Sequence, residues 1–322
     1  MALKSRRFAQ KLILGEYREQ YSLLHRYAQE ILRSNPDNSI KFKLNNNVFE
    51  RVYVCFSALK KGFLAGCRPF FGLDGCFLNG PFGGQFLVAV GRDGNNQMFP
   101  IAWACVEIEK TETWTWFLEL LADELGTVDG HRYTIISKAG QDFLKRNYKK
   151  WVRAYFTSQS TCDVIDNNMN EVFNAYILSS RHKPIITMLE DIRESLMERL
   201  HKKRDYIGNK DITICPRIKT RLEKSKMDAR GWSAFWDGHY CYGVREGATQ
   251  TRYVVSLLDK TCSCNAWQLS GVPCHHAVAA VGHPEHYVSD WFNKDTYLKA
   301  YAFPLELLNG PQQWPESPYE PI

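Results

Sequence analysis

Residues 261–281 read TCSCNAWQLSGVPCHHAVAAV, and this stretch holds four metal-binding side chains close together in the sequence. Cys262 and Cys264 form a C-x-C pair, and Cys274 and His276 follow as C-x-H. A structural Zn²⁺ site takes four ligands in a tetrahedron, drawn mainly from cysteine sulfur and histidine nitrogen. Three thiolates and one imidazole meet that requirement, so the stretch predicts a structural zinc site.

The residues around these ligands predict a strand, a tight turn and a short helix. Residues 253–258 read as a strand whose end delivers the first two cysteines. Pro273 opens an Ala/Val-rich helix, because proline is favoured in the first turn of a helix. We therefore expect Cys274 at or just before the N-cap, His276 in the first turn, and His275 pointing elsewhere.

Two other interpretations of this stretch remain open at the level of sequence. In the first, the cysteines are buried apolar side chains in a reducing compartment and bind no metal. In the second, His283 or His286 replaces His276 as the fourth ligand, although the helix carries both of them away from Cys274.

The spacing of the four ligands resembles that of the SWIM-type zinc finger, whose pattern is C-x-C, a variable gap and C-x-H. The resemblance implies a small ββα-like unit held by structural Zn²⁺, which we place at residues 251–286. It also implies that the unit binds DNA or another protein. Lys260, Trp267 and Gln268 are the nearby residues that we expect to face such a partner.

Length and composition describe a globular chain. Its 322 residues, of which 44% are hydrophobic and 13% aromatic, suffice for two or three domains. No apolar run approaches the roughly eighteen residues that cross a bilayer, so we expect a soluble intracellular protein with no membrane partner. A net charge of +6, with basic residues clustered in residues 145–230, permits contact with nucleic acid.

A second pattern, upstream of the cysteines, predicts a mixed β-sheet. Strands joined by tight turns are expected at residues 71–75, 85–90 and 98–107, followed by a helix at 113–121 and a buried strand at 133–137. Three antiparallel strands, a helix and a parallel strand form the opening of a ribonuclease H-like domain.

Several strings in this region are similar to the transposase domain of plant Mutator-like elements: CRPFFGLDGCFLNG, AVGRDGNN, FPIAWACVEIEKTETWTWFLELL and YTIIS. The strings WVRAYF, CDVIDNNMNEVFNAYIL and IRESLMERL carry the resemblance on towards the finger. In that family two Asp and one Glu hold two divalent metal ions that drive DNA cleavage and joining. Asp74, in the first strand, matches the first of these acids.

The chain departs from the family pattern after the fourth predicted strand. The second acid of the family follows that strand directly, but here Lys138 occupies the position. Residues 138–150 then stand where the family places the rest of its catalytic domain with the catalytic Glu, so we expect an internal truncation. Because Asp74 alone beside a lysine should hold Mg²⁺ poorly, we expect transposase catalysis to be lost.

The alternative is an active or residual metal-dependent DNA transposase or nuclease of the same family. It requires Asp142 in the second place and one further acid in the third, from among Glu107, Glu109, Asp123 and Glu124. Asp74 in isolation is more simply a strand-end residue that caps a turn. We therefore expect no intact catalytic site and no Mg²⁺ cofactor.

The helix expected around residues 167–176 has a polar side that includes Glu171 and Asn174. Polar groups in such a position usually bond to neighbouring backbone, which we expect here in preference to DNA contact.

These patterns divide the chain into five regions within a mixed α+β fold. We expect a helical N-terminal region at 1–66, a truncated transposase domain at 67–142, a helical middle region at 143–250, the SWIM finger at 251–286 and a C-terminal tail at 287–322. The resemblance implies a transposon-derived, zinc-binding protein of the nucleus. Its implied partners are DNA, other proteins or a second copy of the chain.

Overall fold

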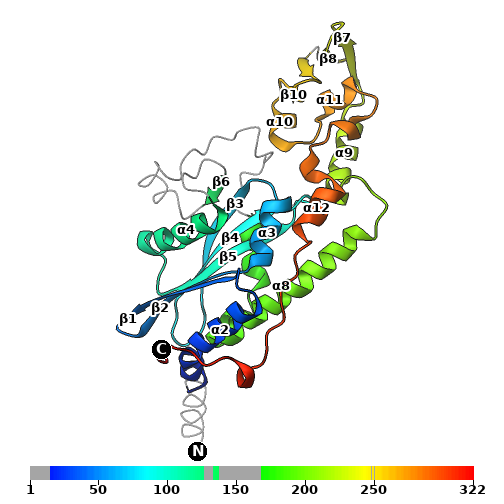
Figure 1. Cartoon of the computed structure of the whole chain (residues 1–322). Coiled ribbons are helices and arrows are strands. Elements are labelled where there is room, and N and C mark those ends of the chain that lie inside the picture. The colour runs from blue at the N-terminus through cyan, green and yellow to red at the C-terminus, as the bar shows by residue number, and fades with distance from the viewer. Residues whose placement is uncertain (1–14, 127–132, 138–167, 248, 250) are drawn as a thin grey trace, which may run out of the picture.

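The computed structural model describes residues 15–126, 133–137, 168–247, 249 and 251–322. A six-stranded sheet with helices on both faces forms the body, and a four-stranded sheet lies beyond α9 at the end of the molecule opposite the β1–β2 hairpin (Figure 1). This architecture confirms the mixed α+β fold class. Within the described part of the chain, no helix has the length and apolar character that a bilayer span needs.

The body sheet has the strand order β1-β2-β5-β4-β3-β6. Its centre is the meander of β3 (Phe70–Phe77), β4 (Gln85–Arg92) and β5 (Met98–Val106), whose neighbours run antiparallel. After helix α4 (Thr111–Leu125), β6 (Thr134–Ser137) pairs parallel with β3. This order and these directions agree with the sheet predicted from the sequence.

A hairpin of β1 (Ser39–Asn45) and β2 (Val48–Cys55) extends this sheet, because β2 pairs antiparallel with β5. The prediction that residues 1–66 are helical is therefore wrong for the hairpin. Asn46 and Asn47 both have positive φ, at 49° and 63°, as the central residues of a type I′ hairpin turn require. The Asn-Asn pair between two segments of alternating hydrophobic and polar residues is the sequence feature that could have predicted this hairpin.

Helices cover both faces of the body sheet. Helices α3 (Ser57–Gly66) and α4 contact β5 from one face, where Phe63 packs edge-on against Phe71 at 6.3 Å. Helix α7 (Asn168–Tyr176) contacts β3, β4 and β5 from the other face. Every residue of β5 is consequently buried, which explains why its sequence is an unbroken apolar run.

The remaining elements connect the body to the second sheet and return from it. Before that sheet come α2 (Leu24–Ser34), η2 (Ser180–His182), α8 (Ile185–Gly208) and α9 (Pro216–Asp228). The sheet itself has the order β10-β9-β8-β7, with β7 at Trp232–Trp236, β8 at Cys241–Glu246, β9 at Arg252–Ser256 and β10 at Thr261–Cys262. After it come α10 (Ala266–Ser270), α11 (His275–Ala280), η3 (Pro284–Tyr287), η4 (Asp290–Phe292), α12 (Lys294–Ala300) and η5 (Pro311–Gln313).

The middle region, predicted helical over 143–250, contains strands β7 and β8, so that prediction is wrong at its C-terminal end. These two strands pair with each other, and β8 pairs with β9. The zinc-finger unit therefore starts well before residue 251, and its sheet includes residues 232–246.

The chain leaves the body for the finger and returns to it at the same place. Ile214 and Asn293 form an antiparallel bridge. Beside it, the backbone N–H of Cys215 donates to Phe292 O at 3.0 Å, and that of Lys294 donates to Thr213 O at 2.9 Å. The finger is thus inserted between two segments of the body. The segment that enters the finger and the segment that leaves it are hydrogen-bonded to each other.

Helix α12 returns from the finger and packs against α3 (Figure 1). The two backbones approach so closely that a Cβ on Gly66 would lie 2.5 Å from Ala300 N, and a Cβ on Gly62 would meet Ala300 O. The tail beyond α12 has no regular element longer than η5, and its Leu305 and Trp314 are buried against the body.

Replacing Gly66 with alanine tests this contact. Alanine normally stabilises a helix interior by about 0.5–1 kcal/mol relative to glycine. Here the added methyl group has no room, so we expect a loss of about 1–3 kcal/mol in the free energy of unfolding, measured by urea denaturation. Gly208→Ala is the matched control, because its nearest neighbouring atom would lie 4.0 Å from the new Cβ. Equal stabilisation by both substitutions would contradict the packing of α12 on α3.

Candidate metal centre

A tight turn after β10 brings the first two cysteines together. Cys262 ends β10 and pairs with Val255 of β9. The backbone N–H of Asn265 then donates to Cys262 O at 2.8 Å, and Asn265 adopts the left-handed conformation with φ of 62°. This reversal turns Cys264 back towards Cys262.

The side chain of Gln268 holds this turn from α10. Its Oε1 accepts the backbone N–H of Cys262 at 3.0 Å, and its Nε2 donates to Cys262 O at 3.0 Å and to Asn265 Oδ1 at 2.8 Å. Its amide therefore shapes the cysteine turn. The side chain is only half-buried, so contact of Gln268 with a partner stays a prediction.

Trp267 is a core residue of the finger. It is 1% exposed and packs edge-on against Tyr287 at a centroid distance of 6.0 Å. The prediction that Trp267 contacts a partner is wrong for this reason. Lys260 is exposed, as predicted, and it borders a cleft of about 600 Å³ between the finger and the body, but whether it contacts a partner stays a prediction.

The second pair of ligand candidates lies at the start of α11. Cys274 is the N-cap residue and His276 is in the first turn, as predicted, but Pro273 lies before the N-cap and does not open the helix. His275 contacts the Trp232 ring at 5.4 Å and lies outside the cluster. His283 and His286, the alternative fourth ligands, also lie outside it, with their rings 5.7 Å apart.

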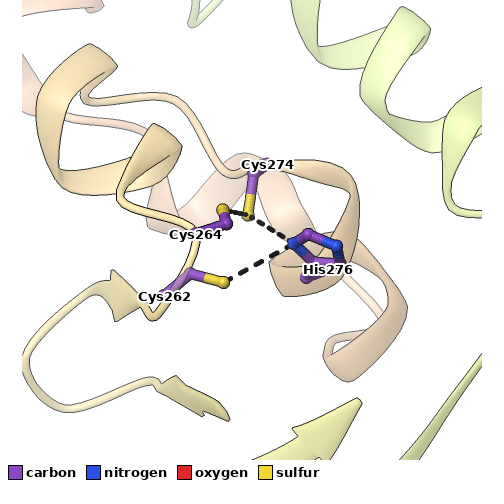
Figure 2. A group of neighbouring side chains, drawn as sticks. All are labelled: Cys262, Cys264, Cys274 and His276. Atoms are coloured by element: carbon purple, nitrogen blue, oxygen red, sulfur yellow. Dashed lines mark hydrogen bonds between the residues drawn. The ribbon is translucent and has the colours of Figure 1, made fainter. Parts of the chain in front are cut away.

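The four side chains point towards one another (Figure 2), and one ligand atom from each lies within 4.8 Å of all the others. The Sγ of Cys262 is 3.6 Å from His276 Nδ1, and that of Cys274 is 3.9 Å from the same nitrogen. Cys264 Sγ lies 3.6 Å from Cys274 Sγ. Ligands at zinc distances on a tetrahedron stand about 3.6–3.8 Å apart, so the donors fit Zn²⁺.

Aromatic packing orients the histidine. The His276 ring stacks on Tyr253 of β9 at 3.8 Å and meets the edge of Trp232 of β7 at 4.4 Å. The ring is 3% exposed. Since a ligand must be held in its orientation by surrounding groups, Trp232 and Tyr253 support the metal site even though neither binds the ion. Sequence spacing gave no sign of Trp232.

The thiols cannot all ionise without a counter-charge. A hydrogen bond to Cys264 raises the pKa of the Cys262 thiol, and the same hydrogen bond lowers the pKa of Cys264. One thiolate is thus stabilised at the expense of its neighbour's ionisation. A divalent cation removes this conflict, because it binds all three sulfurs as thiolates. The donor set, its burial and its electrostatics therefore all favour a metal ion.

Comparison with known protein families agrees with these two parts of the structure. The family model described as SWIM zinc finger matches residues 253–283, which include all four ligand candidates. The family model described as MULE transposase domain matches residues 70–156, beginning at β3. The chain contains a MULE transposase domain and a SWIM zinc finger. Searches of curated proteins and of solved structures find no match.

Within the MULE domain, Asp74 lies on the face of β3 that α7 covers. Its Oδ2 accepts a hydrogen bond from Asn174 Nδ2 at 2.9 Å. The expectation that Asn174 bonds to nearby backbone therefore missed this contact. Glu171 stands one turn before Asn174 on α7, so the helix that contacts Asp74 also carries a second acid. The sequence pattern did not indicate this arrangement.

Three of the other acids considered for a metal site are engaged elsewhere. Burial raises the pKa of Glu107, but hydrogen bonds from Arg51, from its own backbone N–H and from Lys110, together with the charge of Arg51, outweigh burial and lower that pKa to about 2. Glu124 pairs with Lys60 at 2.5 Å, and Glu109 accepts the indole N–H of Trp114 at 3.1 Å. Asp123 is exposed on α4.

Lys138 and Asp142 lie outside the described residues. Among the described residues, the only group of three or more His, Cys, Asp and Glu side chains close enough to share an ion is that of the SWIM finger.

Removing one ligand should abolish metal binding. We expect the purified wild-type chain to hold one zinc per chain by elemental analysis, and Cys274→Ser to hold none, because three donors leave the tetrahedron open. His275→Ala is the matched control and should retain the metal. Chelation should raise amide hydrogen exchange in β7–β10 and α11 while the body strands stay protected. Full zinc loading of Cys274→Ser would show that the ligand set is different.

Proposed function

We propose that this chain is a transposon-derived nuclear protein that binds DNA through its zinc-finger unit and does not cut or join DNA. The single observation that carries the proposal is the contrast between two sets of ligands. The four zinc donors converge on one point. Four of the acids considered for Mg²⁺ in the described residues, Asp74, Glu107, Glu109 and Glu124, are engaged in separate contacts.

Positive charge beside the finger supports DNA binding. Helix α9 leads from the body to the finger and exposes Arg217, Lys219 and Lys224. On the same helix, Lys226 is instead paired with Glu223 at 2.9 Å and with Glu285 of η3. The first three side chains remain available to phosphates, and phosphate contacts supply most of the affinity of proteins for DNA.

Loss of catalysis is supported by Lys138, which stands where the MULE pattern places an acid. It is also supported by the Arg51 ion pair of Glu107 and the Lys60 ion pair of Glu124. Two divalent ions need several carboxylates to offset their mutual repulsion, and these two acids serve as partners of basic side chains instead.

One observation favours the alternative of a residual metal-dependent nuclease. Helix α7 lies beside β3 and carries Glu171 near the Asn174 that bonds to Asp74. Two carboxylates from these elements would give an ion part of a ligand set.

DNA binding is tested by the salt dependence of duplex affinity. We expect the logarithm of the association constant to fall linearly with the logarithm of salt concentration, because each phosphate contact releases counterions. Lys219→Ala with Lys224→Ala should reduce the magnitude of that slope by about 2. The matched control is Arg18→Ala with Lys41→Ala, an equal charge change on exposed residues of the body. A chain that captures no DNA at low salt would instead be a protein-interaction module.

Catalysis is tested by incubating supercoiled plasmid DNA with the zinc-loaded chain and Mg²⁺. We expect no nicking above the level of a buffer control, measured by gel electrophoresis. Magnesium-dependent nicking that Asp74→Asn abolishes would overturn this part of the proposal and establish the nuclease.

A further inference from the structure

One face of the four-stranded sheet packs against the core of the finger, and the other face is exposed to solvent. Because side chains alternate along a strand, Val244 and Val255 point into the finger core, where both are fully buried. Their neighbours point the other way. The register places these neighbours in two adjacent rows, which we call the outer face: Ser233, Arg245 and Arg252, then Phe235, Gly243 and Val254.

Phe235 is held in place but half exposed. A Cβ added to Gly243 would lie 2.6 Å from Phe235 Cζ, so the ring rests across the bare backbone of β8. The side chain of Phe235 is still 50% exposed, and that of Val254, on the far side of Gly243, is 58% exposed. An aromatic ring fixed against glycine, with an aliphatic neighbour, offers a preformed surface for stacking.

Two arginines lie directly opposite each other in the next row. Arg245 pairs in register with Arg252, and both are exposed. Like charges in this position destabilise a sheet, and in the described part of the chain no salt bridge joins either arginine to an acid. Glu246, the neighbour of Arg245 on β8, points to the other face and accepts a hydrogen bond from the Thr249 hydroxyl, and Asp237 at the hairpin tip accepts the backbone N–H groups of His239 and Cys241. The outer face therefore carries unbalanced positive charge.

The tip of the same hairpin carries two more exposed aromatic side chains, although Trp236 shares a row with Tyr242 and Val255 and so lies on the other face of the sheet. Trp236 is 61% exposed and Tyr240 is 60% exposed. The indole N–H of Trp236 donates to His239 O at 2.7 Å, which fixes the ring. The β7–β8 hairpin lies at the far end of the molecule from the β1–β2 hairpin, clear of the body (Figure 1).

We propose that the outer face binds single-stranded DNA, with a base stacked on Phe235 and neighbouring phosphates held by Arg245 and Arg252. The inference rests on the proposed DNA-binding function and assigns it a surface and a strand state. An unpaired base has a free ring face for Phe235, whereas bases within a duplex are stacked on both sides. The missing side chain at Gly243 gives the Phe235 ring its place on the sheet, and the base would stack on the exposed side of that ring.

The test is fluorescence anisotropy of a labelled twelve-nucleotide mixed-sequence oligonucleotide, single-stranded and as its duplex, with the zinc-loaded full chain. We expect Phe235→Ala to weaken single-strand binding roughly 5- to 150-fold, the range for loss of one stacked base. Phe235→Tyr should retain affinity, and Phe235→Leu should not, because leucine keeps apolar volume but has no flat ring. The matched control is Phe77→Ala, which removes a ring 70% exposed on β3.

The contribution of positive charge is tested with the double variant Arg245→Ala and Arg252→Ala. We expect the salt slope of single-strand binding to fall in magnitude by about 1.4, which corresponds to two phosphate contacts on a single strand. Arg18→Ala with Lys41→Ala again serves as the control of equal charge change. Zinc content and melting temperature are measured for every variant, so that loss of fold is separated from loss of contact.

The outcomes separate this inference from the proposed function. If the wild-type chain binds DNA but the outer-face variants bind equally well, the inference fails and the proposed function stands. If Phe235→Ala weakens duplex and single strand alike, or if Phe235→Leu binds as well as wild type, stacking of an unpaired base is overturned. If the wild-type chain binds neither form, the proposed function itself fails.

Discussion

The convergence of three sulfurs and one imidazole nitrogen is the constraint on which the C-terminal part of this protein depends. The four donors lie close enough to share one ion, and a divalent cation would let all three sulfurs bind as thiolates although a hydrogen bond to Cys264 raises the pKa of Cys262. The surrounding groups keep them in place: Gln268 closes the Cys262 turn, and Trp232 and Tyr253 hold the His276 ring. Trp232 lies on β7, so the metal site depends on a strand well upstream of its first ligand.

The finger is also tied firmly to the body. Its two connections are paired at Ile214 and Asn293, and α12 lies against the glycines of α3 immediately afterwards. A rigid attachment of this kind fixes the finger relative to the large sheet. The open face of the finger sheet then belongs to a defined surface of the whole molecule rather than to a freely moving module.

The large sheet keeps a well-packed core, since β4 and β5 are buried between helices on both faces. Several acids of this half serve as ion-pair partners, as in the contacts of Arg51 with Glu107 and Glu112. The fold of the MULE domain is therefore maintained by apolar packing and local ion pairs, neither of which requires a bound Mg²⁺.

The sequence by itself determined the zinc-ligand candidates and the β3–β6 sheet, because ligand spacing, strand alternation and turn residues are local features. It also placed Cys274 at or just before the N-cap of α11, although Pro273 itself lies outside that helix. Only the tertiary structure decided that β2 joins β5, that β8 joins β9, and that α7 lies on Asp74. It likewise showed that Trp267 is buried and that Gln268 braces a turn. Such partners are chosen by burial and backbone hydrogen bonding between distant segments, which no local pattern in the chain records.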